Sequence, residues 1–476
     1  MLTLRASNVC ADEHQEQRMK NARRRNKLPT DAVELQIQRL SHDGRGIASI
    51  EGKIAFVDGA LTGETVKALY VARHKQYDEL RAQEILVSAS ERVQPPCAHA
   101  SVCGGCAMQH LHPDAQVLLK ERVLHEQMQH IGGLTQYEHM PAIRSQSVAY
   151  RRKARLAVRY VTKKESMLVG FREKNSTFIA QMTDCAVLNQ KVSGLIAPLR
   201  VFLAALECRF TIPQIEVAVG ELPTTSAEGI HPAEDVVLIV RHLEPLSAED
   251  HEAFLQFARD HAVQMYFQPK GADSVHKVWP VDGGDRLYYH LPDFGLRMAF
   301  HPTDFTQVNG ELNRHMINRA LTMLDPQEDE QILDLFCGLG NFTLPLATRS
   351  RYVVGVEGSE EMVRRGFENA RENGLNNVEF HAANLCEDFG ASSWAARRYD
   401  KILLDPPRSG ALEIIPVVAA LGARKILYIS CNPATLARDA GELVKHGYVL
   451  TRAGVMDMFP HTSHVESIAE FVLAKS

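Results

Sequence analysis

The sequence predicts a multidomain protein with an N-terminal β-barrel, a central α+β domain and a C-terminal α/β domain. Alternating apolar segments separated by glycines occur near the N-terminus, and clustered cysteines follow a proline pair. After about residue 310, apolar strands alternate with helical stretches. The chain has 476 residues, 45% of them hydrophobic and 23% charged, a globular composition long enough for two or three domains.

The first element, residues 1–28, is polar and basic and has no apolar period. We expect a disordered basic arm. Six basic residues and no acidic one lie between Arg18 and Lys27, and ten basic against two acidic residues lie between Arg144 and Lys174. The net charge of −5 does not exclude nucleic acid, because binding depends on local patches. A solvated tail or face is the alternative explanation for each stretch.

Residues 29–90 predict a small β-barrel of the OB type. Short alternating segments are separated by glycine turns, a pattern typical of such barrels. The segments are 33–37, 53–57 and 65–69. OB-type barrels often bind oligonucleotides, and a purely structural role is the alternative.

Residues 91–305 are expected to form the central α+β domain. A helical pattern covers about 117–130, and strand-like segments recur from about 150 to 300. Three thiols lie within ten residues, and Cys185 is preferred to Cys208 as a fourth metal ligand. The three are Cys97, Cys103 and Cys106. Their spacing leaves structural Zn²⁺ and an iron–sulfur cluster equally open, with free thiols as the weaker alternative.

Residues 306–476 predict an α/β domain with a Rossmann-like fold. Five apolar segments, each followed by a loop and a helical stretch, predict an open parallel sheet with helices on both faces. The segments are 332–336, 352–356, 378–380, 401–404 and 425–429. Ligands of such sheets bind beyond the carboxyl ends of the strands.

Cellular context follows from what the sequence lacks. No apolar run approaches the roughly eighteen residues that a membrane span requires, and the polar N-terminus lacks a secretory signal. We therefore expect a cytoplasmic protein without a membrane partner. The nine cysteines are odd in number and unevenly spread, which does not predict a disulfide framework.

A cofactor pocket is predicted where the first strand of the α/β domain meets its helix. The loop from Asp334 to Asn341 contains two glycines, which allow close backbone approach to a ligand. Glu357 lies 23 residues after Asp334, where a carboxylate can accept ribose hydroxyls. The third glycine of a dinucleotide loop is missing, which favours S-adenosylmethionine over a nicotinamide dinucleotide. Asn384 is placed to meet the adenine, or else caps its loop.

The reacting groups are predicted at two further strand ends. Cys431 follows the fifth strand, and the segment from Asp405 to Arg408 contains two prolines that fix its backbone. A thiolate that adds to C6 of a pyrimidine makes C5 nucleophilic enough to take a methyl group. A lone cysteine is more often a small buried residue, and the motifs around Cys431 favour the nucleophile instead.

The C5 proton must then be removed by a base. The run 459–467 offers His461, His464 and Glu466, of which Glu466 is preferred; a hydrated turn is the alternative. A stacked target base must also be flipped out of the RNA. Phe305 is expected to stack against the displaced base, and Gln307 to bond nearby polar groups, although the segment also fits an ordinary loop.

Together these motifs resemble the bacterial RNA uracil-5-methyltransferases. The resemblance runs from the barrel, which is similar to a TRAM domain, to the C-terminus, and leaves only the basic arm uncovered. It implies a [4Fe-4S] cluster on Cys97, Cys103, Cys106 and Cys185. It implies S-adenosylmethionine contacts from Gln307, Phe336, Asn341, Glu357, Asn384 and Asp405. It also implies Cys431 as nucleophile and Glu466 as proton acceptor. The substrate contacts that we expect from Phe305 and Arg408 come from the residues themselves, not from the resemblance.

The presence of both a barrel and a cysteine cluster favours the branch of the family that acts on 23S ribosomal RNA. We expect the protein to be a monomer and to have no DNA partner. Another ribosomal or transfer RNA site is the nearest alternative, and a cytosine-5 methyltransferase uses the same thiol chemistry. A radical methylthiotransferase needs C-x3-C-x2-C, whereas this chain has C-x5-C-x2-C. A non-catalytic assembly factor is disfavoured by Cys431 and Glu466 beside a complete cofactor loop. Extra residues between Cys185 and Gln307 depart from the family pattern.

Overall fold

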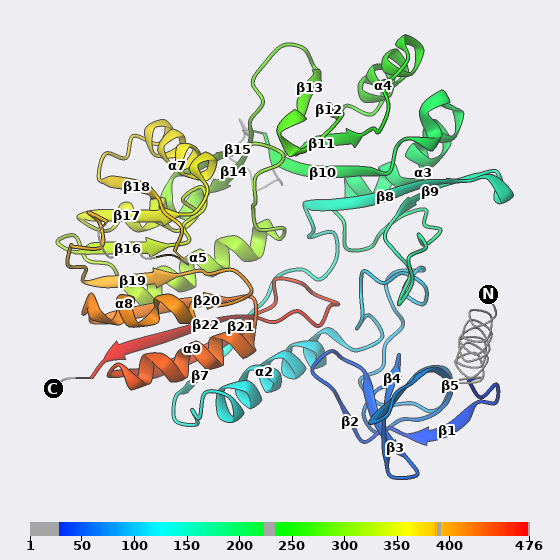
Figure 1. The fold of residues 1–476 in the computed structure, drawn as a ribbon, viewed down its shortest axis with the longest axis horizontal. Coiled ribbons are helices and arrows are strands. Elements are labelled where there is room, and N and C mark those ends of the chain that lie inside the picture. Colours follow the sequence, from blue (N-terminus) through cyan, green and yellow to red (C-terminus); the bar gives the residue numbers. More distant parts are fainter. Residues whose placement is uncertain (1–27, 223–233, 386, 388–391, 475–476) are drawn as a thin grey trace, which may run out of the picture. The chain divides into compact units, whose positions relative to one another are not determined.

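The computed structural model describes residues 28–222, 234–385, 387 and 392–474 (Figure 1). The predicted basic arm lies outside these residues except for its last position. Contacts divide the chain into two compact units, one up to Gln94 together with 110–112, the other comprising 95–109 and the chain from Pro113 onward. Within the described part of the chain, no helix has the length and apolar character needed to cross a membrane.

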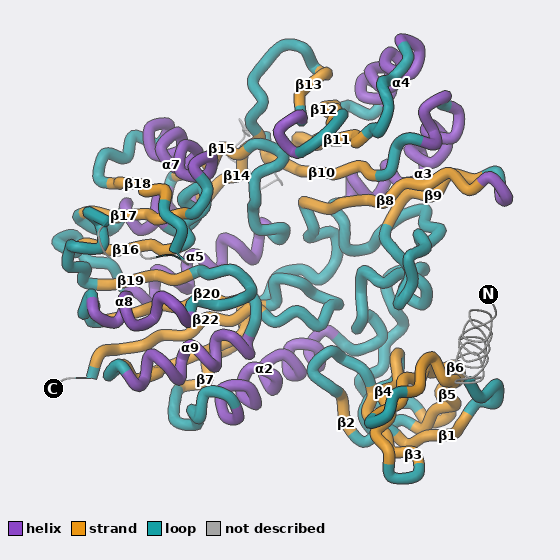
Figure 2. The backbone as a smooth tube through the Cα atoms, viewed as in Figure 1, coloured by secondary structure: helices purple, strands orange, loops and turns teal. Residues whose placement is uncertain are grey.

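The first unit is a six-stranded sheet with the order β1-β5-β6-β4-β3-β2 (Figure 2). Its strands are β1 Val33–Gln36, β2 Arg39–Leu40, β3 Gly46–Ile50, β4 Lys53–Asp58, β5 Thr65–Arg73 and β6 Tyr77–Val87. Alternate side chains such as Val57 and Val66 point into one apolar core. Glu64 is fully buried, and its carboxylate accepts hydrogen bonds from Arg92 Nε at 2.6 Å and from the Leu61 N–H at 2.8 Å. The three segments predicted as strands are strands here.

The second unit contains a six-stranded central sheet with the order β13-β12-β11-β10-β8-β9. Its strands are β8 Lys153–Val161, β9 Ser166–Gly170, β10 Gln214–Glu221, β11 Glu234–Arg241, β12 Gln264–Gln268 and β13 His276–Trp279. Two helices, α3 Gln190–Ala205 and α4 Ala248–Asp260, share one apolar cluster with Val217 and Leu238, which pair across β10 and β11. Both helices therefore cover the same face of this sheet. A hairpin, β14 Leu287–Leu291 and β15 Leu296–Phe300, follows.

The same unit contains an eight-stranded sheet with the order β18-β17-β16-β19-β20-β22-β21-β7. Its strands are β7 Glu138–Ile143, β16 Gln331–Leu335, β17 Tyr352–Glu357, β18 Val378–Ala382, β19 Lys401–Leu404, β20 Lys425–Ser430, β21 Tyr448–Met456 and β22 Glu466–Leu473. The accompanying helices are α2 Pro113–His130, α5 Gly310–Leu324, α6 Thr343–Ala347, α7 Glu360–Glu372, α8 Ile415–Ala420 and α9 Pro433–Lys445. Strands β16 to β20 are the five predicted strands, and they are parallel to one another.

The sheet continues beyond the five predicted parallel strands, and the added strands are not all parallel to them. Strand β22 runs antiparallel to both β20 and β21, and β7 then pairs in parallel with β21. The reason is the connection: residues 457–465 join β21 to β22 without a crossover helix, and a short connection between paired strands gives an antiparallel pair. This reversal brings the start of β22 to the edge at which β16, β17, β19 and β20 end.

Candidate active site

The predicted nucleophile and the predicted base lie side by side because of strand register. In the antiparallel pair of β20 and β22, Ser430 pairs with Ser467. Cys431 is the next residue after β20 and Glu466 is the first residue of β22, so the two occupy adjacent positions across the pair. Cys431 is half-buried and Glu466 is 9% exposed. A thiol that is accessible to a ligand and a shielded carboxyl group therefore share one edge of the sheet.

The electrostatics of this edge disfavour further negative charge. Burial, reinforced by Asp405, raises the pKa of Glu466 to about 8 against the opposing charges of Lys120 and Arg408. Burial, reinforced by Glu466 and Asp405, raises the pKa of the Cys431 thiol to about 11. Burial also raises the pKa of Asp405 to about 7. Such an edge suits a cationic ligand, and its carboxyl groups can exchange protons near neutral pH.

The segment from Asp405 to Gly410 is fixed against neighbouring elements. The Asp405 N–H donates to the Leu335 carbonyl at 3.2 Å, which ties the end of β19 to the end of β16. The Arg408 carbonyl accepts a hydrogen bond from Asn432 Nδ2 at 3.1 Å. Asn432 is the N-cap of α9, directly after Cys431. The Arg408 side chain is exposed, so it is available to an incoming ligand.

The predicted cofactor loop has the strained backbone that its glycines indicated. Phe336 has a positive φ of 64°, and its N–H donates to the Val356 carbonyl at 2.8 Å. Gly340 has a φ of 94°, and a Cβ there would lie 2.6 Å from Leu344 Cδ1. The Gly338 N–H donates to Glu357 Oε2 at 3.1 Å. The Glu357 carboxylate, which we expected to bind the ribose, thus accepts a hydrogen bond from the glycine loop itself.

Asn341 is held by partners that the sequence did not reveal. Its Oδ1 accepts from Tyr289 Oη at 2.8 Å and from Asn313 Nδ2 at 3.0 Å, and its Nδ2 donates to Asn313 Oδ1 at 2.9 Å. Asn313 lies on α5 and Tyr289 on β14, far from the loop in sequence. No local pattern links these elements, so only the fold reveals the pairing.

Asp334 is a second feature that sequence reasoning missed. Its side chain is fully buried, and Oδ2 accepts from Thr343 Oγ1 at 2.6 Å. Oδ1 is buried without a hydrogen-bond partner among the residues that the structure describes. Burial, reinforced by Asp405 and Glu357, raises the pKa of Asp334 to about 8. The Oδ1 atom can therefore donate a hydrogen bond to a ligand when the carboxyl group is protonated and accept one when it is ionised.

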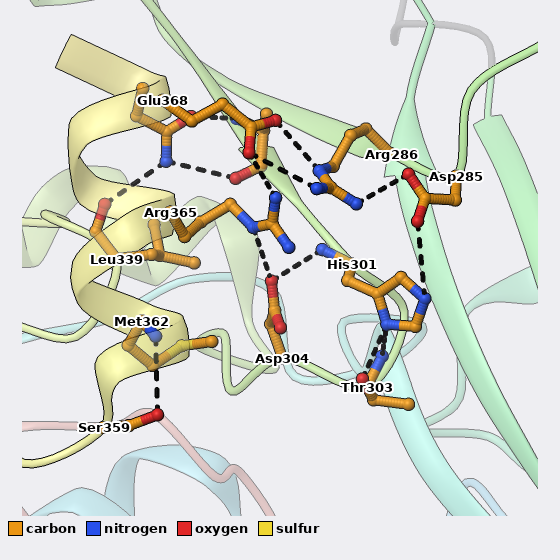
Figure 3. Close-up of polar contacts among 12 residues, drawn as sticks. Asp285, Arg286, His301, Thr303, Asp304, Leu339, Ser359, Met362, Arg365 and Glu368 are labelled. Atoms are coloured by element: carbon orange, nitrogen blue, oxygen red, sulfur yellow. Dashed lines mark hydrogen bonds and ion pairs between the residues drawn. The ribbon is translucent and has the colours of Figure 1, made fainter. Parts of the chain in front are cut away.

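The loop carrying Phe305 and Gln307 is held by a buried ion pair (Figure 3). Arg365 on α7 donates from Nε to Asp304 Oδ2 at 3.0 Å, and the His301 N–H donates to the same oxygen at 2.6 Å. Phe305, the next residue, is 75% exposed, and Gln307 is half-buried. The aromatic ring predicted to stack on a base therefore projects from a firmly anchored loop.

Asn384 lies after β18 and is exposed. Its Nδ2 donates to Glu387 Oε1 at 2.8 Å. The structure therefore shows a side-chain contact within the loop, and both adenine contact and loop capping stay predictions.

The four cysteines predicted as metal ligands gather around one cavity. Cys97, Cys103, Cys106 and Cys185 are buried and line a space of about 300 Å³. Cys208 instead lies in a short 3₁₀ helix, where its N–H donates to Asp250 Oδ2 at 2.8 Å. Among the described residues, no three His, Cys, Asp or Glu side chains are close enough to hold a single metal ion. Residues 462–464, just before Glu466, also line the cavity.

The three candidate bases occupy different surroundings. His461 is buried, and its Nδ1 lies 3.1 Å from Gln116 Nε2 on α2. His464 is exposed and lines the cysteine cavity. Of the three, Glu466 alone is placed by strand register beside Cys431.

Comparison with known proteins identifies the family of the chain. A 23S rRNA (uracil(1939)-C(5))-methyltransferase RlmD from Alcanivorax borkumensis is 51% identical over 450 residues, covering 94% of this chain and 98% of its own length. The protein of the same name from Hahella chejuensis is 49% identical over 454 residues, with coverages of 94% and 99%. The family model for tRNA (Uracil-5-)-methyltransferase matches residues 289–474. The chain belongs to the RNA uracil-5-methyltransferase family.

A solved structure shares the fold of this RNA uracil-5-methyltransferase family member. The tRNA (uracil-54, C5)-methyltransferase of Pyrococcus abyssi, in complex with S-adenosyl-L-homocysteine, superimposes with a TM-score of 0.69 and 23% identity. The match covers 92% of this chain and all of the other. The Rossmann-like α/β fold predicted for the C-terminal part of the chain is thereby confirmed, and its bounds at 306–476 stay a prediction.

Proposed function

We propose that the chain transfers a methyl group from S-adenosylmethionine to C5 of a uridine in 23S ribosomal RNA, the position that the names of its relatives give as 1939. Family membership supports the reaction class. The observation that carries the mechanism is the register that sets Cys431 beside Glu466 at the edge where the 334–341 loop begins. We further propose that the enzyme acts as a cytoplasmic monomer.

In the proposed mechanism, Cys431 gives its proton to solvent and its thiolate adds to C6 of the flipped uracil. This addition converts the ring into an enolate, and C5 of the enolate is nucleophilic. Bound S-adenosylmethionine supplies the methyl group. Glu466 takes the C5 proton, and the C6–sulfur bond breaks to return the thiolate of Cys431. Because the pKa of Glu466 is about 8, a fraction of this carboxyl group is ionised at neutral pH and can act as a base.

The remaining predicted contacts are assigned to the two substrates. We assign cofactor binding to Gln307, Phe336, Asn341, Glu357, Asn384 and Asp405. Phe305 would stack against the displaced base, and its 75% exposure leaves its ring free to do so. Arg408 is exposed beside Cys431 and would contact RNA phosphate or the base.

We propose that the cysteine cavity holds a [4Fe-4S] cluster. Four thiolates around one Zn²⁺, with bonds of about 2.3 Å, would have to lie within roughly 4 Å of each other. The four cysteines line, with other residues, a cavity of about 300 Å³, and among the described residues no three ligands are close enough for a single ion. This suits a polynuclear cluster, which spreads its ligands. The cluster would supply a rigid centre for the surrounding segments.

We also propose that residues 29–90 are a TRAM-like barrel that helps to bind RNA, assisted by the basic arm 1–28. Residues 91–305 would form the cluster-bearing domain, and residues 306–476 would carry out methyl transfer. The six-stranded sheet of the first unit supports the barrel assignment.

The test uses ribosomal RNA from a strain that lacks the modification, incubated with protein and S-adenosylmethionine. Mass spectrometry should locate one 5-methyluridine. Cys431→Ala should give neither product nor a covalent complex. Glu466→Gln should accumulate a covalent RNA complex that already carries the methyl group. Cys208→Ala, which replaces a buried thiol far from the site in sequence, is the matched control and should remain active.

Methylation by the Cys431→Ala protein would refute the thiol mechanism. Wild-type protein that binds the RNA without methylating it would favour a non-catalytic assembly role. A methylated cytosine would move the enzyme to the cytosine-5 class.

A further inference from the structure

The segment that ends at Glu466 is held from the side by helix α2. This helix packs against α9 and β21 (Figure 1). Lys120 is 1% exposed, and its Nζ donates to Asp457 Oδ1 at 2.6 Å and to the Phe459 carbonyl at 3.0 Å. Asp457 directly follows β21, so this buried cation fixes the start of the 457–465 loop.

Gln116 lies one helical turn before Lys120 and fixes the middle of the loop. Its Oε1 accepts from the His461 N–H at 2.8 Å, and its Nε2 donates to the Met108 carbonyl at 3.0 Å. The N–H groups of Ala107 and Met108 both donate to the His461 carbonyl at 3.0 Å. Because Gln116 is 1% exposed, these bonds form in a shielded environment, where breaking one is costly.

Lys120 also acts on Glu466 through its charge. The groups whose charges influence Glu466 are Asp405 and Arg408 after β19, Lys120 on α2 and, from the end of β20, Cys431. Asp405 and the thiolate of Cys431 oppose ionisation of Glu466, whereas Lys120 and Arg408 favour it. Arg408 is exposed and screened by solvent, so Lys120 is the buried cation of this set.

We propose that Lys120, with Gln116, is a positioning residue for Glu466: it fixes the 457–465 loop that leads into Glu466, and its buried positive charge favours the ionised carboxylate. The inference rests on the proposed function, in which Glu466 removes the C5 proton. Proton removal follows methyl transfer, so a misplaced Glu466 slows the release of product from Cys431 and spares the earlier steps.

The test is a single-turnover assay with the full-length protein, S-adenosylmethionine and unmodified ribosomal RNA. Denaturing gels and mass spectrometry measure the formation and the release of the methylated covalent complex as functions of pH. The variant is Lys120→Met with Asp457→Asn, because removing Lys120 alone would leave a buried unpaired carboxylate. Its matched control is Lys401→Met with Glu330→Gln.

The control replaces a similar pair at the opposite edge of the sheet. Lys401 Nζ and Glu330 Oε2 are 2.9 Å apart, and both side chains are 3% exposed. Lys401 begins β19, whereas the site lies where β19 ends. The control therefore reports the cost of losing a buried ion pair without touching the surroundings of Glu466.

In the Lys120 variant we expect methyl transfer to be nearly unchanged. Losing the cation should raise the midpoint of the release profile by about one pH unit, which slows release at pH 7 about tenfold. Gln116→Met keeps Lys120, and should slow release without moving the midpoint. If the Lys120→Met and Asp457→Asn double variant does not fold, Gln116→Met still tests whether the helix positions the loop.

The control pair should leave the ratio of the two steps and the midpoint unchanged. A parallel fall of both steps in the Lys120 variant, or an unmoved midpoint, would overturn the inference. If Glu466→Gln accumulates the complex while the Lys120 and Gln116 variants do not, only this inference fails. If the wild type forms no complex, the proposed function fails first.

Discussion

Replacing Arg365 by Met tests how the Phe305 loop is anchored. The substitution keeps most of the side-chain volume and removes the guanidinium group that bonds Asp304. The side chains of Arg365 and Asp304 are 5% and 1% exposed, so the pair is buried. Breaking such a pair by removing one partner costs about 3–5 kcal/mol.

We expect the lower end of this range for a specific reason. Asp304 keeps the His301 N–H as a donor, and Lys153 bonds the Asp304 carbonyl. A loss of about 3 kcal/mol corresponds to a fall in melting temperature on the order of 5 °C for a unit of this size. The Phe305 loop should also lose its fixed position, so kcat/KM for RNA should fall by more than tenfold while S-adenosylmethionine binding changes less.

Differential scanning calorimetry and initial rates measure both effects. The matched control is Arg297→Met, which removes an arginine that pairs with Glu372 on the same helix but is 46% exposed. An exposed pair of this kind contributes less than about 1 kcal/mol. Asp304→Asn combined with Arg365→Met should recover part of the stability, because no unpaired carboxylate remains. Equal destabilisation by the Arg365 and Arg297 variants would refute the reasoning.

Three further outcomes are expected. Because the pKa of Glu466 is about 8, release of product should rise about tenfold between pH 7 and pH 9, as the ionised fraction rises; a flat profile would exclude Glu466 as the base. Cys185→Ser should lower the iron content of anaerobically purified protein, whereas Cys208→Ser should not, and stoichiometric zinc in the wild type would contradict the cluster. Phe305→Ala should weaken formation of the covalent RNA complex by about tenfold, equivalent to about 1.4 kcal/mol of lost stacking, with cofactor affinity unchanged.

Local patterns predicted the parts of this protein that depend on local sequence. The apolar runs of β16 to β20 lie within single short segments, and Gly338 and Gly340 adopt the positive φ that glycine allows. Cys431 was predicted from its position after the fifth strand and Glu466 from the polar run 459–467, and their catalytic roles stay predictions. Each of these features can be read within about ten residues.

The remaining features depend on contacts between distant segments. Lys120 and Asp457 are 337 residues apart, and Asn313 is 28 residues from Asn341. Strand β7 joins the final sheet from a region that the sequence assigned to another domain. Burial also decides the pKa values of Asp334 and Glu466, and an acidic residue alone does not reveal it. These features follow from tertiary packing, which periodicity does not encode.

The same burial leads to a prediction about the two forms of the cofactor. S-adenosylmethionine carries a sulfonium charge, and its demethylated product does not. Asp334 and Asp405 have pKa values of about 8 and about 7, so both are partly protonated at pH 7. A cation placed beside these two carboxyl groups lowers both pKa values. Binding of S-adenosylmethionine should therefore release protons to the buffer. Calorimetric titrations in buffers of different ionisation enthalpy measure this release.

We expect clear proton release with S-adenosylmethionine and less with S-adenosylhomocysteine. Asp405→Asn should reduce the difference between the two ligands, because one titrating carboxyl group is removed. Glu361→Gln, at an exposed position in the first turn of α7, should leave it unchanged. Equal release with both ligands would mean that the sulfonium does not lie near these carboxyl groups. Unequal proton release would also explain how the spent cofactor leaves. Methyl transfer removes the sulfonium charge that is attracted to the carboxyl groups, and so favours dissociation of S-adenosylhomocysteine.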